Sequence, residues 1–213
     1  SFYPLLLDLA FSHLNLSQQS LDSLTDDVKY QDRVQSLYTL FGQYYKLNHQ
    51  ASLSYLSYQK ALAAALTQYT SPRSREVAKI YAQMASLSLE CNELSSLNDY
   101  VKKGINKLIP EFQHQEIPNE NQIDGENTFV DLLSLKSRYY YLLYDECTDP
   151  TYIDSAMLSL DLAISANDKL NDNILLNHSK YISISTNKSL VSHAIEYCHK
   201  AYVQTQKTQY LDK

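Results

Sequence analysis

Glycine, proline, cysteine and tryptophan are all scarce in this sequence. The chain of 213 residues contains three glycines, five prolines, three cysteines and no tryptophan. Sandwiches, barrels and Rossmann sheets need turn-forming residues about every ten positions, so the scarcity argues against all three. Helices with short connections fit the composition best. With 44% hydrophobic residues, the chain is long enough for one domain with a continuous core.

The cysteines and the apolar segments exclude further classes of protein. Cys91, Cys147 and Cys198 are odd in number and widely spaced, which is neither a disulfide framework nor a zinc pattern. We expect reduced, mostly buried thiols. No apolar run reaches eighteen residues, and the first residues lack the layout of a secretory signal. We therefore expect a cytoplasmic protein without contact to a membrane.

The charge balance bears on nucleic acids. The net charge is −6, from 18 basic and 24 acidic residues. Neutralising phosphates requires a basic face, which this composition does not favour. We expect no direct binding of nucleic acid by this segment.

Catalytic and metal-binding patterns are weak throughout. His193 and His199 are six residues apart, which on a helix separates them by about 240°, unlike the paired histidines of HExxH. The sequence has no GxGxxG, GxxxxGK[ST] or GxSxG motif, and its scattered glycines cannot form a phosphate-binding loop. We expect no enzyme, no metal and no other cofactor, with unrecognised helical chemistry as the alternative.

One spacing recurs along the chain: a small residue, a bulky residue four positions later, and a small residue three positions after that. The copies are Ser54, Tyr58 and Ala61; Leu97, Val101 and Gly104, the loosest; Ala156, Leu160 and Ala163; and Ala194, Cys198 and Ala201. These offsets lie on one stripe of a helix, where small residues let a second helix approach closely. The residues twelve positions earlier are Gly42, Ala85, Tyr144 and Ile182.

The first copy resembles the tetratricopeptide consensus in Tyr38, Phe41, Gly42, Tyr45, Ser54, Tyr58 and Ala61. Later copies match less well, because Tyr144 and Ile182 stand where the consensus has a small residue. The resemblance covers roughly residues 30 to 206. It implies an all-α fold, a right-handed superhelical array of antiparallel helix pairs.

We predict a single domain made of N-terminal helices, two pairs of repeats, a loop and a tail. Their ranges are 1–28 for the N-terminal helices, 29–109 for repeats 1–2, 110–126 for the loop, 127–206 for repeats 3–4 and 207–213 for the tail. Separate helices are predicted over 2–14 and 17–26, and over 171–186 and 189–206. The loop is rich in proline and amides, and we favour a mobile connection over a functional lid.

In the tetratricopeptide family the first helix of each pair lines a concave groove, and the resemblance implies which residues face it. They are Thr39, Gln43, Lys46, Lys79, Gln83, Ser86, Arg138, Tyr141, Ser179, Lys180, Ser183 and Asn187. Amides and hydroxyls suit a peptide backbone, and Lys79, Arg138 and Lys180 suit its carboxylate. A solvated polar face is the alternative.

Long, irregular repeats and phrases such as Ala194-Ile195-Glu196-Tyr197 followed by Lys200-Ala201 resemble the sensor domains of Gram-positive quorum-sensing regulators of the Rgg, PlcR and Rap type. In that family the domain often follows a helix-turn-helix, binds a short imported peptide and forms dimers. No helix-turn-helix is evident in this sequence. The resemblance implies a regulatory domain of a cytosolic transcriptional regulator or signalling protein that binds a short peptide or partner segment, with a homodimer expected. A constitutive scaffold or adaptor without a switching ligand is the alternative.

Overall fold

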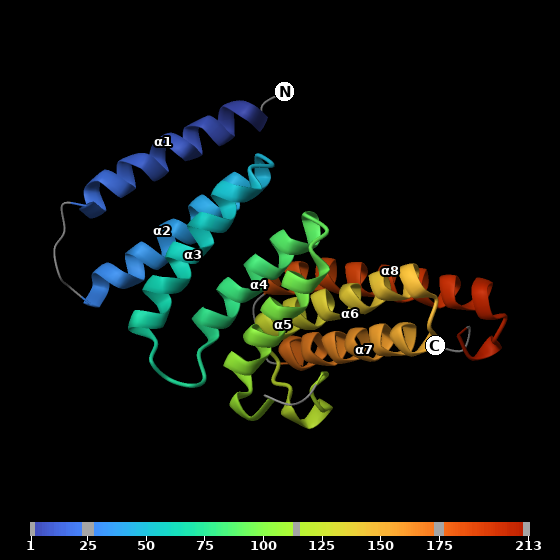
Figure 1. Cartoon of the computed structure of the whole chain (residues 1–213). Helices are drawn as coiled ribbons and strands as arrows, with labels where there is room; N and C mark the ends of the chain where they lie inside the picture. Colours follow the sequence, from blue (N-terminus) through green and yellow to red (C-terminus); the bar gives the residue numbers. More distant parts are fainter. Residues whose placement is uncertain (1–2, 23–27, 113–115, 173–176, 211–213) are drawn as a thin grey trace. The chain divides into compact units, whose positions relative to one another are not determined.

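The computed structural model describes residues 3–22, 28–112, 116–172 and 177–210. Over these residues the chain forms eight α-helices and three short 3-10 helices, and no strand (Figure 1). The prediction of an all-α fold is confirmed. The chain divides into two compact units, Ser1–Pro110 and Glu111–Lys213. Each is considered by itself.

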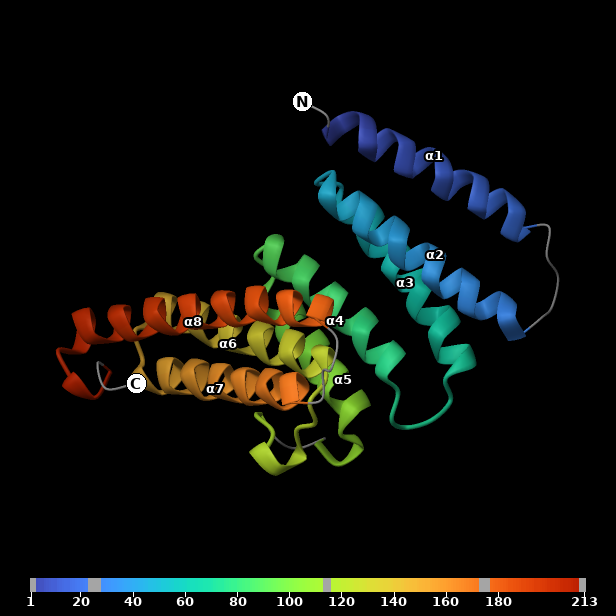
Figure 2. The same cartoon turned by 180° about the vertical axis from the view of Figure 1, so that it is seen from behind.

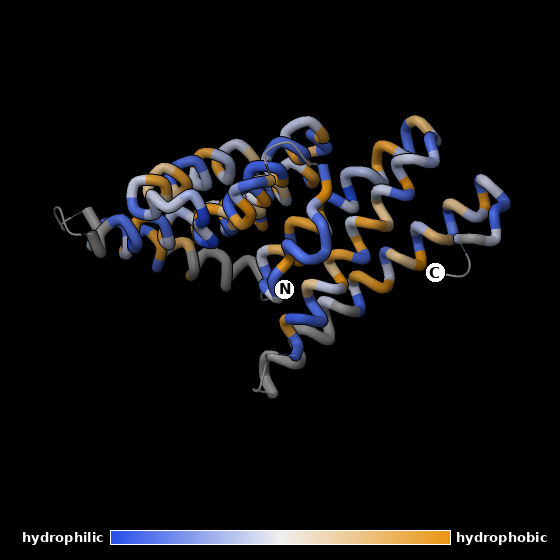
Figure 3. The backbone as a smooth tube through the Cα atoms, turned by 90° about the horizontal axis from the view of Figure 1, so that it is seen from below, coloured by the Kyte–Doolittle hydropathy of each residue, from blue (hydrophilic) through white to orange (hydrophobic). Residues whose placement is uncertain are grey.

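The first unit contains five helices. They are α1 (Tyr3–Asp22), α2 (Val28–Leu47), α3 (Ala51–Gln68), α4 (Arg75–Glu90) and α5 (Leu94–Leu108). Short turns make α2 and α3 one antiparallel hairpin, and α4 and α5 another (Figure 2). Helix α1 packs on α2, and α3 packs on α4. Hydrophobic and hydrophilic segments alternate along these helices, as amphipathic helices require (Figure 3).

The first hairpin is built around Gly42. The hydroxyl of Ser54 on α3 donates a hydrogen bond of 2.7 Å to the Gly42 carbonyl oxygen on α2. A β-carbon at position 42 would lie 2.4 Å from a ring carbon of Tyr58, so only glycine admits that ring. Tyr58 and Ala61 are fully buried in the same contact. The close approach predicted from the first copy of the spacing is therefore present.

The second hairpin also buries its predicted stripe. Helix α4 begins at the N-cap Ser74, whose side chain accepts a hydrogen bond from the Val77 backbone nitrogen. On α5 the buried face includes Leu97, Val101 and Gly104, the loosest copy of the spacing. The two helices therefore pack along the stripe that the spacing indicates.

The second unit is formed by α6 (Asn127–Cys147), α7 (Pro150–Asp172) and α8 (Asn177–Thr205). Ala156, Leu160 and Ala163 are buried on α7, as the third copy predicts. The small residue that meets them on α6 is Ser137, whose hydroxyl donates a hydrogen bond of 2.7 Å to the Ala156 carbonyl oxygen. Tyr144, twelve residues before Ala156, is buried as a bulky packing residue instead.

Two predicted helix breaks are wrong. The ranges 2–14 and 17–26 contribute to a single helix α1, and most of 171–186 and 189–206 forms the single helix α8 of 29 residues. Neither break contains a glycine or proline. In α1, the hydroxyl of Ser17 donates to the His13 carbonyl oxygen at 2.9 Å, so this polar side chain is satisfied within the helix.

The continuity of α8 overturns the fourth repeat. The fourth repeat requires two antiparallel helices, one with Ile182 and one with Ala194. In the structure, both residues lie on one continuous helix. No hairpin therefore exists between them. Helix α8 packs against α7.

The segment 116–126 lies against α6 and α7, which does not support the expectation of a mobile connection. The Lys169 side-chain nitrogen donates to the carbonyl oxygens of Glu120 and Ile123, both at 3.1 Å. A β-carbon on Gly125 would lie 2.6 Å from the Leu170 backbone nitrogen. The side chain of Lys136 on α6 is 0% exposed, and its nitrogen lies 3.1 Å from a Glu116 carboxylate oxygen.

Candidate peptide-binding face

The predicted groove residues of α4 share one accessible stripe. Lys79, Gln83 and Ser86 are spaced by four and three residues and are all partly exposed. The opposite side of α4 is buried in the apolar core of the unit. The sequence register therefore places these three residues on the accessible side of the helix.

The predicted groove residues of α2 differ in their contacts. Gln43 is exposed, whereas the Thr39 hydroxyl donates a hydrogen bond of 2.8 Å to the Gln35 carbonyl oxygen of its own helix. The Lys46 side-chain nitrogen donates to the Ser86 hydroxyl oxygen at 2.7 Å. This bond brings the accessible stripes of α2 and α4 together.

Gln83 contacts Tyr58 of the first hairpin. The Tyr58 hydroxyl lies 3.4 Å from the Gln83 side-chain oxygen and donates a long hydrogen bond to it. Burial raises the pKa of Tyr58 to about 12, so the hydroxyl stays protonated and remains a donor at neutral pH. The Gln83 side chain is partly exposed, so its amide is accessible in part from solvent.

Sequence reasoning missed two leucines on this surface. Leu40 and Leu47 are 50% and 59% exposed, and they stand on either side of Gln43 along α2. Their spacing of seven residues is a signal that a search for polar positions passes over. We call Leu40, Gln43, Lys46 and Leu47 of α2, together with Lys79, Gln83 and Ser86 of α4, the α2–α4 face.

The basic residues of this face have acidic partners. Lys46 lies 3.0 Å from a carboxylate oxygen of Glu90, and Lys79 lies 3.0 Å from one of Glu76. Two carboxylates of α4 thus offset the positive charges of Lys46 and Lys79. The α2–α4 face is close to electrically neutral, which weakens the expectation that Lys79 captures a ligand carboxylate.

The predicted groove residues of the second unit are placed differently. Tyr141 is 6% exposed, and its ring stacks on Tyr197 of α8 with ring centres 4.2 Å apart. Arg138 lies over the Tyr141 ring at 5.0 Å, and its guanidinium pairs with Glu196 at 3.5 Å. Lys200 also contacts this ring. Tyr141 is therefore a packing residue between α6 and α8, with little surface left for a ligand.

The remaining predicted groove residues lie on the first half of α8. They are Ser179, Lys180, Ser183 and Asn187, and their side chains lie outside the described residues. Their selection depended on the fourth repeat, which the continuous α8 removes.

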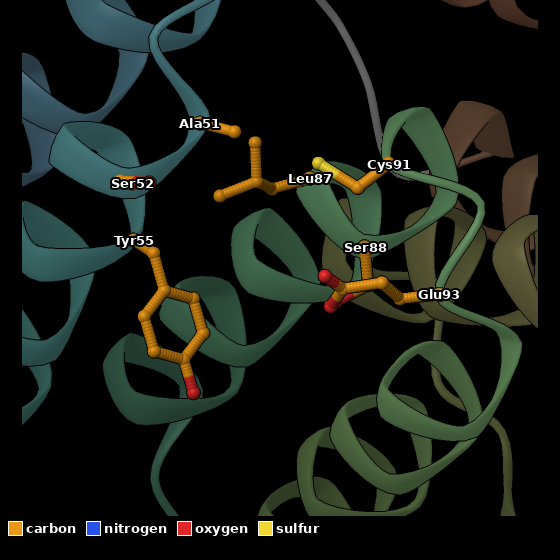
Figure 4. A pocket seen from close by; sticks show the side chains of 7 residues that line it. All are labelled: Ala51, Ser52, Tyr55, Leu87, Ser88, Cys91 and Glu93. Atoms are coloured by element: carbon orange, nitrogen blue, oxygen red, sulfur yellow. The ribbon is translucent and has the colours of Figure 1, made fainter.

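A hollow that the sequence did not predict lies beside the turn between α4 and α5. Its volume is about 320 Å³, and its lining residues are Ala51, Ser52, Tyr55, Leu87, Ser88, Cys91 and Glu93 (Figure 4). Such a hollow depends on how α3 meets α4, which local sequence patterns do not report.

None of the three cysteines forms a disulfide, but their side chains are not mostly buried as expected. Cys91 and Cys147 are exposed, and Cys198 is partly exposed. Among the described residues, no three or more His, Cys, Asp and Glu side chains gather as a metal site. His193 stacks on the ring of Tyr197.

Comparison with known proteins adds no family. No protein-family model matches the chain, and neither the curated proteins nor the solved structures give a significant match. In the described part of the chain, no helix is both long and apolar enough to cross a membrane.

Proposed function

We propose that this chain is a tetratricopeptide-like regulatory domain that binds a peptide segment on its α2–α4 face. The observation that carries the proposal is the hydrogen bond from Lys46 to Ser86, which joins the first helices of two successive hairpins. Contact between the first helices of neighbouring pairs is what a tetratricopeptide-like superhelix requires. The consensus-like packing of Gly42 against Tyr58 supports the same arrangement.

The chemistry of the face defines the class of ligand. Two half-exposed leucines flank an exposed amide, and both lysines are paired with carboxylates. Exposed ion pairs contribute at most about 1 kcal/mol, so affinity must come from apolar contacts and hydrogen bonds to amides. We propose a short extended peptide with apolar side chains, bound through its backbone by Gln43 and Gln83.

The resemblance to quorum-sensing regulators of the Rgg, PlcR and Rap type supplies the biological setting of this proposal. A cytoplasmic sensor domain would bind an imported peptide and pass the signal to a DNA-binding or catalytic partner domain. A constitutive scaffold is the second candidate, and one observation favours it. Lys46 already has partners in Ser86 and Glu90 of the same chain, so this lysine needs no ligand to be paired.

A peptide-display selection against the purified full chain tests the proposal. Selected peptides are then titrated by calorimetry against Leu40→Ser and against Leu158→Ser, a matched control with a similarly exposed leucine on α7. We expect Leu40→Ser to weaken binding by about 1 kcal/mol, roughly fivefold, because it removes half-buried apolar area at the interface. Leu158→Ser should bind like the parent. Equal binding by both variants would place the ligand elsewhere, and failure to select any peptide would favour the scaffold.

A further inference from the structure

We propose that the hollow between α3 and the α4–α5 turn is a subsite for a basic side chain, the lysine or arginine of a bound peptide. This inference rests on the proposed function only because a bound peptide is the source of that side chain. The hollow and its carboxylate do not depend on that function. The expected occupant has an aliphatic stem and a cationic end.

The walls of the hollow are apolar on one side. Tyr55 and Ala51 come from the beginning of α3, and Leu87 comes from the last turn of α4 (Figure 4). The Tyr55 ring also packs beside the ring of Tyr100 on α5, and the two hydroxyls are in contact. A volume of about 320 Å³ is at the lower end of the range for ligand pockets, which suits one long side chain better than a larger molecule.

The opposite wall carries a carboxylate. Glu93 occupies the N-cap position of α5, yet its side chain makes no capping hydrogen bond. In Figure 4 the carboxylate points toward the hollow beside Ser88. Among the described residues it has no ion-pair partner, in contrast to Glu90 three residues earlier, which pairs with Lys46. An unpaired negative charge across from an aromatic ring is the arrangement that attracts a cation, through both the charge and the face of the ring.

The lining also rules out the opposite ligand. Among the residues that the structure describes, no lysine, arginine or histidine lines the hollow. A carboxylate or phosphate would therefore meet Glu93 without any compensating positive charge. A purely apolar side chain would fit the Leu87 wall but leave the carboxylate without a partner.

Cys91 at the edge of the hollow provides a local probe, and exposed Cys147 in the other unit provides an internal reference. The full chain is treated separately with two methanethiosulfonates of similar size, one carrying trimethylammonium and one carrying sulfonate. The thiolate attacks the sulfenyl sulfur, forms a mixed disulfide and releases methanesulfinate. Peptide mass spectrometry gives the rate at each cysteine.

We expect Glu93→Gln to lower the ratio of cationic to anionic rates at Cys91 by roughly two- to fivefold, the range for one partly exposed charge pair. The ratio at Cys147 should stay unchanged. The control Asp161→Asn removes one exposed carboxylate on α7 and should leave the ratio at Cys91 as it is. An unchanged ratio in Glu93→Gln, or an equal change in the control, would overturn the proposal.

A protection experiment then tests the side chain itself. Acetyl-Leu-Arg-Leu-amide should slow the reaction of Cys91 with a neutral methanethiosulfonate, whereas the peptide with norleucine in place of arginine should not. Tyr55→Phe keeps the ring and should retain protection, and Tyr55→Leu should lose it. Equal protection by both peptides, or by neither, would overturn the subsite. If peptides selected on the α2–α4 face still bind in that case, the proposed function stands without the subsite.

Discussion

The hairpins α2–α3 and α6–α7 carry the same small-bulky-small spacing on their second helix. The residue of the first helix that packs against this spacing differs between the two hairpins. In the first hairpin, Gly42 offers no side chain, and the Tyr58 ring lies directly against its backbone. In α6–α7, the Ser137 hydroxyl reaches the Ala156 carbonyl oxygen across the interface. The small-bulky-small stripe therefore predicts where a second helix is buried, but it does not fix which residue of the first helix meets it.

The largest effect should come from filling the shared small position in both hairpins. Ala61 on α3 and Ala163 on α7 are both 0% exposed. Ala61→Trp and Ala163→Trp should each destabilise the chain by about 3 kcal/mol or more, because overpacking forces the helices apart. Urea unfolding followed by circular dichroism measures the change. If only one variant is destabilised, the two hairpins do not use the stripe alike.

A pH-dependent effect should distinguish the first hairpin through Tyr58. Burial raises the pKa of Tyr58 to about 12 from 10, so the folded chain keeps a proton that the unfolded chain loses. Stability from this group is complete below pH 10 and is lost as the pH rises toward 12. The loss amounts to about 2–3 kcal/mol, from about 1.4 kcal/mol per pKa unit. Tyr58→Phe should make urea midpoints in this pH window less steep. An unchanged slope would show that other groups govern the alkaline loss.

The smallest effect should come from the two hydroxyls that cross the hairpins. Ser54→Ala and Ser137→Ala each remove a buried hydrogen bond of 2.7 Å to a carbonyl oxygen. Each should cost about 1 kcal/mol, more if the carbonyl oxygen is left without a partner. Thr67→Ala is the control, because its hydroxyl bonds within its own exposed turn. Amide hydrogen exchange localises the change to one hairpin, and equal changes in the control would argue against a special role for either bond.

Local patterns predicted the helices and the first hairpin, because glycine and small residues limit how helices can pack. They did not predict that α8 is continuous. Asn187 and Lys188 are compatible both with a helix end and with a helix interior, so their local propensity does not decide between the two. The burial of Tyr141 has the same origin, since periodicity places a residue on a face without saying which helix covers it.

The candidate site was predictable only in part for a related reason. The positions of Lys79, Gln83 and Ser86 on one stripe follow from spacing alone. The pairing of Lys46 with Glu90, however, joins two helices that are distant in sequence. The neutrality of the α2–α4 face and the hollow lined by Glu93 both arise from such contacts.

The burial of Lys136 has a consequence for amine chemistry. Its ammonium group is closed off from solvent and faces Glu116, a residue that belongs to the segment 116–126 and not to a helix. This ion pair ties the segment to α6, because separating the two charges would weaken the stabilisation of a buried ammonium group. Acylating reagents that modify the surface lysines can reach this amine only after the segment has left α6. The extent of acylation at Lys136 is thus a direct measure of how often the second unit opens along that edge.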